Sequence, residues 1–299
     1  MQFFYSDDFN LKLPEKHRFP AQKYRLLREK LLADGLLARD QLSVSEPASR
    51  ADILLAHDKE YIEGLEDGSI DRQAMRRIGF PWSPQIPLRG FRTAGGALQA
   101  AEYALENGLS GQLAGGTHHA HAGFGAGFCI LNDFAVVALK LLSEARAERI
   151  AIIDLDVHQG DGNAAILGDH RQVFILDIYG RKNFPFRKVP ATLDVALEDN
   201  PGDDFYLQEL RAALPQVWNF APDLVLYQAG VDPLVHDRLG RMDISFEGLM
   251  ARDRLVLEGC HTRGIACSMG IGGGYANPIE PTVEAYANTY RVAKQIYRF

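Results

Sequence analysis

The stretch GGTHHAHAGFGAGF, residues 115–128, holds three of the nine histidines of the chain among five glycines. Glycine loses more conformational freedom on folding than any other residue, so this segment is a poor candidate for a helix or a strand interior. Histidine titrates near neutral pH, and the adjacent imidazoles of His118 and His119 can supply a general base and a general acid. We therefore expect a loop that holds these side chains around a reacting group.

A second polar cluster is the string DLDVHQGDG, residues 154–162, which follows a buried apolar run. Asp156 and His158 are two residues apart, so in an extended segment their side chains point to the same side. With Asp232, from the string AGVDP, they would offer one imidazole nitrogen and two carboxylates. Three protein ligands and one open position are typical of a catalytic zinc site rather than a structural one.

Three more residues complete a hydrolytic set. Asp154 can orient a neighbour or help to hold a cation, and Asp161 can fix the tautomer of a histidine. Tyr275 follows three glycines, so its hydroxyl can approach an oxyanion closely. Taken alone, each motif is equally consistent with a loop cap, a turn or a histidine pair bonded to backbone. Together they describe the hydrolysis of an amide or ester through a tetrahedral intermediate.

The elements that must position these residues alternate along the chain. Buried β-branched runs predict parallel strands, at 149–157, 172–178, 223–230 and 264–274. Amphipathic stretches predict helices, at 93–107, 132–147, 203–220, 245–263 and 280–298. Alternating strands and helices predict an α/β fold with helices on both faces of a sheet. Ligands bind outside the carboxyl ends of such strands, where these polar residues fall.

Composition limits the alternatives. The chain has 299 residues, 46% of them hydrophobic, which suits a single domain over residues 1–299. A net charge of −7 argues against nucleic acid and anionic membranes as partners. The opening MQFFYSDDFN has no signal-peptide pattern, and no apolar run is long enough to span a membrane, so we expect a cytoplasmic protein. Three cysteines without metal-knuckle spacing are expected to be reduced, buried thiols.

Several strings resemble the zinc-dependent histone deacetylase family and its acetoin-utilisation and acetylpolyamine relatives. These strings are GGTHHA, GFCILND, DLDVHQGDG, AGVDPLVHDRLGRMDIS and GGGY, and the resemblance covers nearly the full length. HRFPAQKYRLLREKL, DIYGRKNFPF and DRLGRMDIS make the chain most similar to class IV members. The resemblance implies the arginase–deacetylase fold, a three-layer α/β/α arrangement with a largely parallel central sheet.

The resemblance also implies roles for individual residues. It matches Asp156, His158 and Asp232 to the ligands of one Zn²⁺ per chain. His118 and His119 match the catalytic histidines, with His119 as the base, Asp154 and Asp161 match their supporting carboxylates, and Tyr275 matches the carbonyl-polarising tyrosine. Thr117, Gly127 and Phe128 match the lining of the acyl tunnel, with a further residue expected on the opposite wall. Asp154, Asp156, His158 and Asp177 match a monovalent cation site for K⁺ or Na⁺.

Two departures from class I relatives bear on the substrate. Thr117 stands where many of them carry a large aromatic residue, which predicts a roomier tunnel floor. Pro81 stands where they place a rim aspartate that anchors the substrate backbone. The implied substrate is therefore an acylated lysine of a protein or a small acylated amine, with an acyl group of acetyl length or longer.

Two alternatives to a zinc-dependent amidohydrolase remain open from the sequence. An arginase-like ureohydrolase would use the same fold with two metal ions and more bridging carboxylates. A zinc-binding module without catalysis would keep the fold alone. The number of metals and an assay for deacylation separate the three.

Overall fold

The computed structural model describes residues 1–7, 11, 13–14 and 17–299, so residues 8–10 of the opening stretch lie outside the described part. Within that part, eight strands form one sheet in the order β2-β1-β3-β8-β7-β4-β5-β6, and every neighbouring pair is parallel. The strands are β1 Phe3–Tyr5, β2 Leu42–Val44, β3 Leu109–Gln112, β4 Ile150–Asp154, β5 Val173–Gly180, β6 Leu193–Leu197, β7 Leu224–Gln228 and β8 Ala266–Gly270.

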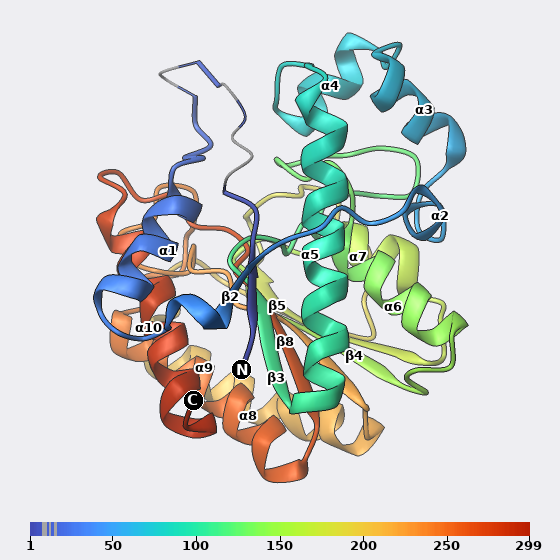
Figure 1. The fold of residues 1–299 in the computed structure, drawn as a ribbon. Helices are drawn as coiled ribbons and strands as arrows, with labels where there is room; N and C mark the ends of the chain where they lie inside the picture. The colour runs from blue at the N-terminus through green and yellow to red at the C-terminus, as the bar shows by residue number, and fades with distance from the viewer. Residues whose placement is uncertain (8–10, 12, 15–16) are drawn as a thin grey trace.

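Helices cover both faces of the sheet, so the predicted three-layer α/β/α architecture is confirmed (Figure 1). Helices α5 and α6 lie on one face, and α8, α9 and α10 lie on the other, while α3 and α4 stand beyond the carboxyl ends of the strands. The helices are α1 Lys23–Ala33, α2 Arg50–Ile53, α3 Lys59–Asp67, α4 Arg72–Ile78, α5 Gln85–Asn107, α6 Asp133–Ser143, α7 Asp161–Leu167, α8 Gly202–Phe220, α9 Phe246–Arg263 and α10 Glu280–Tyr297. A 3₁₀ turn spans Arg39–Gln41.

The central strands are those with the most continuous apolar sequence. Every residue of β4, β7 and β8 is buried, because helices cover both of their faces. The helix boundaries also follow local chemistry. The side chain of Asn132 caps α6 by accepting the backbone N–H of Ala135, and Ser245 caps α9 through the N–H of Gly248. Gly264, with a φ of +67°, ends α9 in the left-handed conformation that glycine adopts without strain.

Two expectations about the elements need correction. The helix predicted over 93–107 begins at Gln85, eight residues earlier, because Pro87 falls in its first turn, where no intrahelical N–H is needed. Gly90 is then an interior helix residue that packs against Leu131, where a Cβ would come within 2.9 Å of Cδ1. The short strands β1, β2, β3 and β6 lie outside the four predicted strand ranges.

One continuous cluster of buried apolar side chains runs through both helix layers and the sheet. The two ends of the described chain meet, since the rings of Phe3 and Phe299 lie 5.4 Å apart between centroids. All three cysteines are free and buried, as expected. In the described residues, no helix combines the length and the apolar character needed to cross a membrane.

Candidate active site

The polar residues singled out in the sequence come from the carboxyl ends of four adjacent strands. In the sheet these strands stand in the order β3, β8, β7, β4. The last residue of β4, Asp154, lies opposite Gln228 of β7, which lies opposite Gly270 of β8. The loops that follow therefore start at the same level of the sheet, and the residues meet at one edge.

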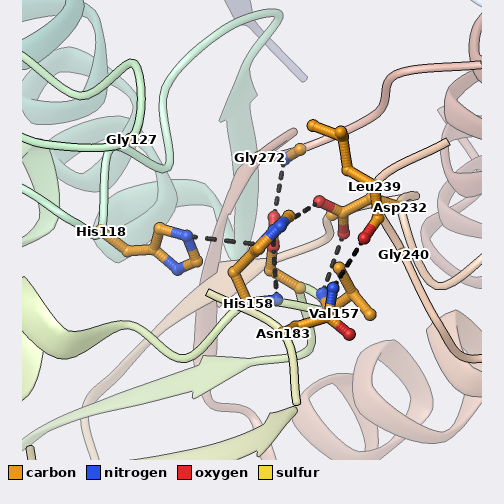
Figure 2. A network of polar contacts seen from close by, with 12 residues as sticks. His118, Gly127, Val157, His158, Asn183, Asp232, Leu239, Gly240 and Gly272 are labelled. Carbon is orange, nitrogen blue, oxygen red and sulfur yellow. Dashed lines mark hydrogen bonds and ion pairs between the residues drawn. The ribbon is translucent and has the colours of Figure 1, made fainter. Parts of the chain in front are cut away.

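The side chains of Asp156, His158 and Asp232 form a group whose nearest donor atoms all lie within 4.8 Å of one another. Nδ1 of His158 is 3.0 Å from Oδ1 of Asp156 and 3.0 Å from Oδ2 of Asp232. Figure 2 shows His158 between His118 and Asp232. Backbone N–H groups hold both carboxylates, since Val157 donates to Oδ1 of Asp232 at 2.9 Å and Gly273 donates to Oδ2 of Asp156 at 2.7 Å.

This group fits a divalent metal ion. Oδ2 of Asp232 is buried and accepts no properly directed hydrogen bond. Burial and the neighbouring carboxylate of Asp156 raise the pKa of Asp232 to about 7. A bound cation would remove both costs, and the set of one imidazole and two carboxylates suits zinc with an open position.

Each histidine of the adjacent pair has its own carboxylate. Nδ1 of His118 lies 2.8 Å from Oδ2 of Asp154, and Nδ1 of His119 lies 2.7 Å from Oδ1 of Asp161. Both histidines are buried, and their rings are 4.1 Å apart between centroids. His121 also reaches Asp161, with Nε2 at 3.1 Å from Oδ2, which sequence reasoning did not foresee. Its place in the same histidine-rich string was the available signal.

The pKa values of the two histidines of the pair are shifted in opposite directions. Burial opposes a charge on His118, but the carboxylates of Asp154 and Asp156 raise its pKa to about 10. Burial and the charge of His118 lower the pKa of His119 to about 3. At neutral pH the proton therefore resides on His118, and His119 is a neutral base.

A cavity of about 630 Å³ opens above these groups. Thr117, Gly127, Phe128 and Tyr275 line it, as do both members of the histidine pair. Gly127 has a φ of +54°, and a Cβ there would lie 2.5 Å from Cδ2 of His119, so only glycine fits. The hydroxyl of Thr117 is 2.6 Å from the carbonyl oxygen of Leu131, which turns this small side chain into the wall.

Phe184 stands across from Gly127 and is the opposite wall that the sequence left unidentified. Its ring meets the ring of His119 edge to face, with 4.8 Å between centroids. A Cβ on Gly127 would lie 3.1 Å from Cε1 of Phe184. The width of the cavity beside His119 is therefore set by the ring of Phe184 and by the absence of a side chain at Gly127.

Lys23 is a further residue that sequence reasoning missed. Its side chain is fully buried, and Nζ donates to the carbonyl oxygen of Gly272 at 3.2 Å and to Tyr286 Oη at 3.1 Å. Nζ also lies 5.0 Å from the centroid of the Tyr275 ring. Burial lowers the pKa of Lys23 to about 8, although the Asp232 carboxylate opposes the shift. Lys23 thus holds the glycine loop that carries Tyr275.

One other side chain limits the chemistry of the site. Cys129 lines the cavity, but burial raises the pKa of its thiol well above the usual value, so it is not a thiolate nucleophile.

Asp177 lies opposite Asp154 in the β4–β5 register and accepts the N–H of Gly160 at 2.8 Å. Its Oδ1 is buried without a hydrogen-bond partner among the described residues.

Comparisons with known proteins identify the family of the chain. Residues 17–290 match the model of the histone deacetylase domain. The chain is 42% identical to an uncharacterized protein of Picosynechococcus sp., over 98% of both chains. It is 33% identical to histone deacetylase 2 of Arabidopsis thaliana, over 91% of this chain and 73% of that one. The acetoin utilization protein AcuC of Staphylococcus aureus is 28% identical, over 91% of this chain and 76% of that one.

Solved structures show the same fold. An HDAC homolog crystallised with SAHA superposes with a TM-score of 0.83 at 24% identity, covering 99% of this chain and 88% of that one. The HD domain of HDA15 superposes with a TM-score of 0.81 at 18% identity, covering 98% and 87%. The chain therefore belongs to the histone deacetylase domain family. Its fold is the arginase–deacetylase fold, and it is a metal-dependent amide hydrolase, which confirms the predicted family, fold and type of enzyme.

Proposed function

We propose that this protein is a zinc-dependent deacylase that hydrolyses the amide bond of an acylated lysine or a small acylated amine. One observation carries the proposal. The Asp156, His158 and Asp232 group faces the same cavity as a neutral His119 and a charged His118. A Lewis-acid site, a base and an acid are the three groups that amide hydrolysis needs.

Asp156, His158 and Asp232 would hold the zinc ion. When bound, zinc polarises a carbonyl oxygen and lowers the pKa of a coordinated water. The backbone N–H groups of Val157 and Gly273 keep both carboxylates oriented for this role.

The side chains around the metal group would move the protons. His119 takes a proton from the attacking water while Asp161 holds its ring. The water oxygen bonds to the carbonyl carbon, and the C–N bond breaks as His118, charged and paired with Asp154, protonates the departing nitrogen. The products are a carboxylate and a free amine.

Tyr275 would stabilise the oxygen that becomes negative during attack. Its ring lies 6.4 Å from that of His158 between centroids, and its hydroxyl makes no hydrogen bond to another described residue. Burial raises the pKa of this hydroxyl well above its usual value, so it stays a proton donor. A free donor in a desolvated cavity gains most when charge develops near it.

The acyl group would lie between Gly127 and Phe128 on one side and Phe184 on the other. Thr117 leaves space in the lining, so we propose that chains longer than acetyl are accepted. Thr117→Trp should then reduce hydrolysis of long acyl chains more than hydrolysis of acetyl. Equal losses for both chain lengths would remove Thr117 from the acyl pocket.

Proposals on the domain, a cation, the class and the location accompany the deacylase function. We propose that residues 1–299 form a single domain, which the one sheet and the one apolar cluster of the described residues support. A K⁺ or Na⁺ ion would bind near Asp154 and Asp177, together with main-chain oxygens around Asp156 and His158, supported by the unpaired Oδ1 of Asp177. The strings around Lys23, Phe184 and Asp237 support placement in class IV, and a cytoplasmic location fits the three free thiols.

A zinc titration tests the function. Protein stripped of metal is supplied with Zn²⁺ in steps, and hydrolysis of an acetyl-lysine peptide is followed at each step. We expect activity to level off at one ion per chain, and His119→Ala to hold the same ion without turnover. Two ions per chain with urea released from arginine would favour the ureohydrolase alternative. Bound zinc without any deacylation would favour the non-catalytic module.

A further inference from the structure

The mouth of the cavity is positively charged, although the whole chain carries a net charge of −7. Five basic side chains line it, and they come from four separate segments. They are Arg18, Arg76, Arg77, Lys182 and Arg241. Among the described residues of the lining, Asp156 is the only one with an acidic side chain, and it belongs to the metal group. We propose that the acylated amine hydrolysed here carries a carboxylate outside the tunnel, which this basic rim recognises. The inference rests on the proposed deacylase function.

The charge of the rim is uneven. Lys182 and Arg241 share Asp199, whose Oδ2 lies 3.3 Å from Nζ of Lys182 and 3.4 Å from NH1 of Arg241. Arg18, Arg76 and Arg77 have no carboxylate within ion-pair distance in the part of the chain that the structure describes. These three guanidinium groups therefore form the side of the rim that can take an anion.

The backbone under these arginines is fixed relative to the tunnel. The carbonyl oxygens of Arg77 and Ile78, at the end of α4, accept the N–H groups of Gly127 and Phe128 at 3.1 and 2.7 Å. The guanidinium of Arg77 also stacks on the ring of Phe124, 4.4 Å from its centroid. A substrate whose acyl group lies beside Gly127 therefore meets Arg77 at a constant distance.

Arg18 is tied to the same rim. Nε2 of its neighbour His17 bonds to the carbonyl oxygen of Gly79, the residue that ends α4, at 2.9 Å. The ring of Phe19 packs on those of Phe80 and Phe128, with centroids 5.1 and 5.3 Å away. The chain thus uses aromatic packing to bring a third arginine to the mouth.

Helix stabilisation alone does not explain this arrangement. Arg76 and Arg77 lie in the last turn of α4, where a positive charge favours the helix dipole. That effect concerns only residues at the end of α4. It does not explain why Arg18, Lys182 and Arg241, which belong to other segments, line the same cavity. Clefts lined by one sign of charge concentrate ligands of the opposite sign, and guanidinium groups pair well with carboxylates.

Three matched peptides test the proposal. Each carries one acetyl-lysine, flanked on both sides by glutamate, glutamine or lysine, and kcat/KM is measured at low and high salt. Exposed ion pairs contribute modestly, so the two glutamates predict about a tenfold preference over glutamine at low salt. Lysine flanks should be the poorest, and the preference should shrink at high salt because exposed charges are screened.

Variants assign the preference to the rim. Arg76→Gln combined with Arg77→Gln should reduce the ratio of kcat/KM for glutamate and glutamine peptides by at least threefold. Arg211→Gln removes one positive charge from the exposed side of α8, outside the cavity lining, and should leave that ratio unchanged. Equal loss in both variants would mean that total charge, not the rim, sets the preference, and would overturn the proposal.

A second pair of substrates identifies the source of the carboxylate. Nε-acetyl-lysine is compared with its carboxamide, which lacks the negative charge. If only the peptides show a preference for the negatively charged substrate, the carboxylate belongs to acidic side chains of a protein. If only Nε-acetyl-lysine is preferred over its carboxamide, the carboxylate belongs to a free amino acid. Equal rates within both sets overturn the inference while leaving the deacylase function intact. If none of these compounds is hydrolysed, the proposed function itself fails.

Discussion

The close packing around Gly127 predicts a specific defect in Gly127→Ala. The new methyl group would lie 2.5 Å from Cδ2 of His119 and 3.1 Å from Cε1 of Phe184. The wall cannot retreat easily, because the N–H groups of Gly127 and Phe128 are both bonded to the end of α4. His119 must therefore move.

The size of the effect follows from these distances. Non-bonded carbons prefer a separation of about 3.5–4.0 Å, so the imidazole must shift by roughly 1 Å, which breaks its 2.7 Å contact with Asp161. A misplacement of about 1 Å costs on the order of 10²-fold in rate. Overpacking adds a loss of stability of about 1–3 kcal/mol, and alanine in the left-handed region costs roughly 1 kcal/mol more.

Gly35→Ala is the matched control. Gly35 has a φ of +64°, close to the +54° of Gly127, and a Cβ there would meet nothing within 4 Å. It should lose about 1 kcal/mol by denaturant unfolding and keep its kcat. If Gly127→Ala, with metal content unchanged, has a kcat within twofold of that of Gly35→Ala, the missing side chain at residue 127 does not position His119.

Three further predictions concern the metal, the tyrosine and pH. Asp232→Ala should stay folded and lose most of its bound zinc, because the two remaining ligands bind the ion too weakly. Full zinc occupancy by elemental analysis would remove Asp232 from the ligand set. Tyr275→Phe should lower kcat by ~10²–10³, or roughly 3–4 kcal/mol, with little change in KM, and an intact kcat would leave the ring with a packing role only. Burial lowers the pKa of His57 from 6.5 to about 4, so the unfolded chain takes up the proton first and stability falls as the pH drops between these values. The loss amounts to about 3 kcal/mol for this buried side chain, and a His57→Gln variant that keeps the same pH slope of stability as the wild type would show that His57 is not its source.

The parts of the fold that the sequence predicts are those that local pattern determines. Strands β4, β5, β7 and β8 are largely continuous apolar runs. Such runs are typical of strands in a sheet that is covered on both faces. β1 and β2 have three residues each and gain their structure by pairing with neighbours far along the chain. No periodicity can be read from segments of that length.

The same distinction holds for the site. The placement of Asp156, His158, Asp161, Asp232 and Tyr275 at one edge of the sheet was predictable, because each follows a strand and parallel strands end at one edge. Lys23 looks like an ordinary solvent-facing lysine of an amphipathic helix, and only the packing of α1 against α10 buries it beside Tyr286. Phe184 lies in a loop whose path depends on tertiary contacts, so its position across from Gly127 has no local signal.

The most direct test of the central claim follows the oxygen atom of water. The zinc-loaded protein is incubated with an acetyl-lysine peptide in ¹⁸O-labelled water, and both products are measured by mass spectrometry. Because the one cysteine in the cavity lining, Cys129, is held as a thiol by burial, water is the expected nucleophile. We expect free lysine peptide and an equal amount of acetate that carries one ¹⁸O atom. Intact peptide, or acetate without the label in a single turnover, would overturn the proposed hydrolysis by water.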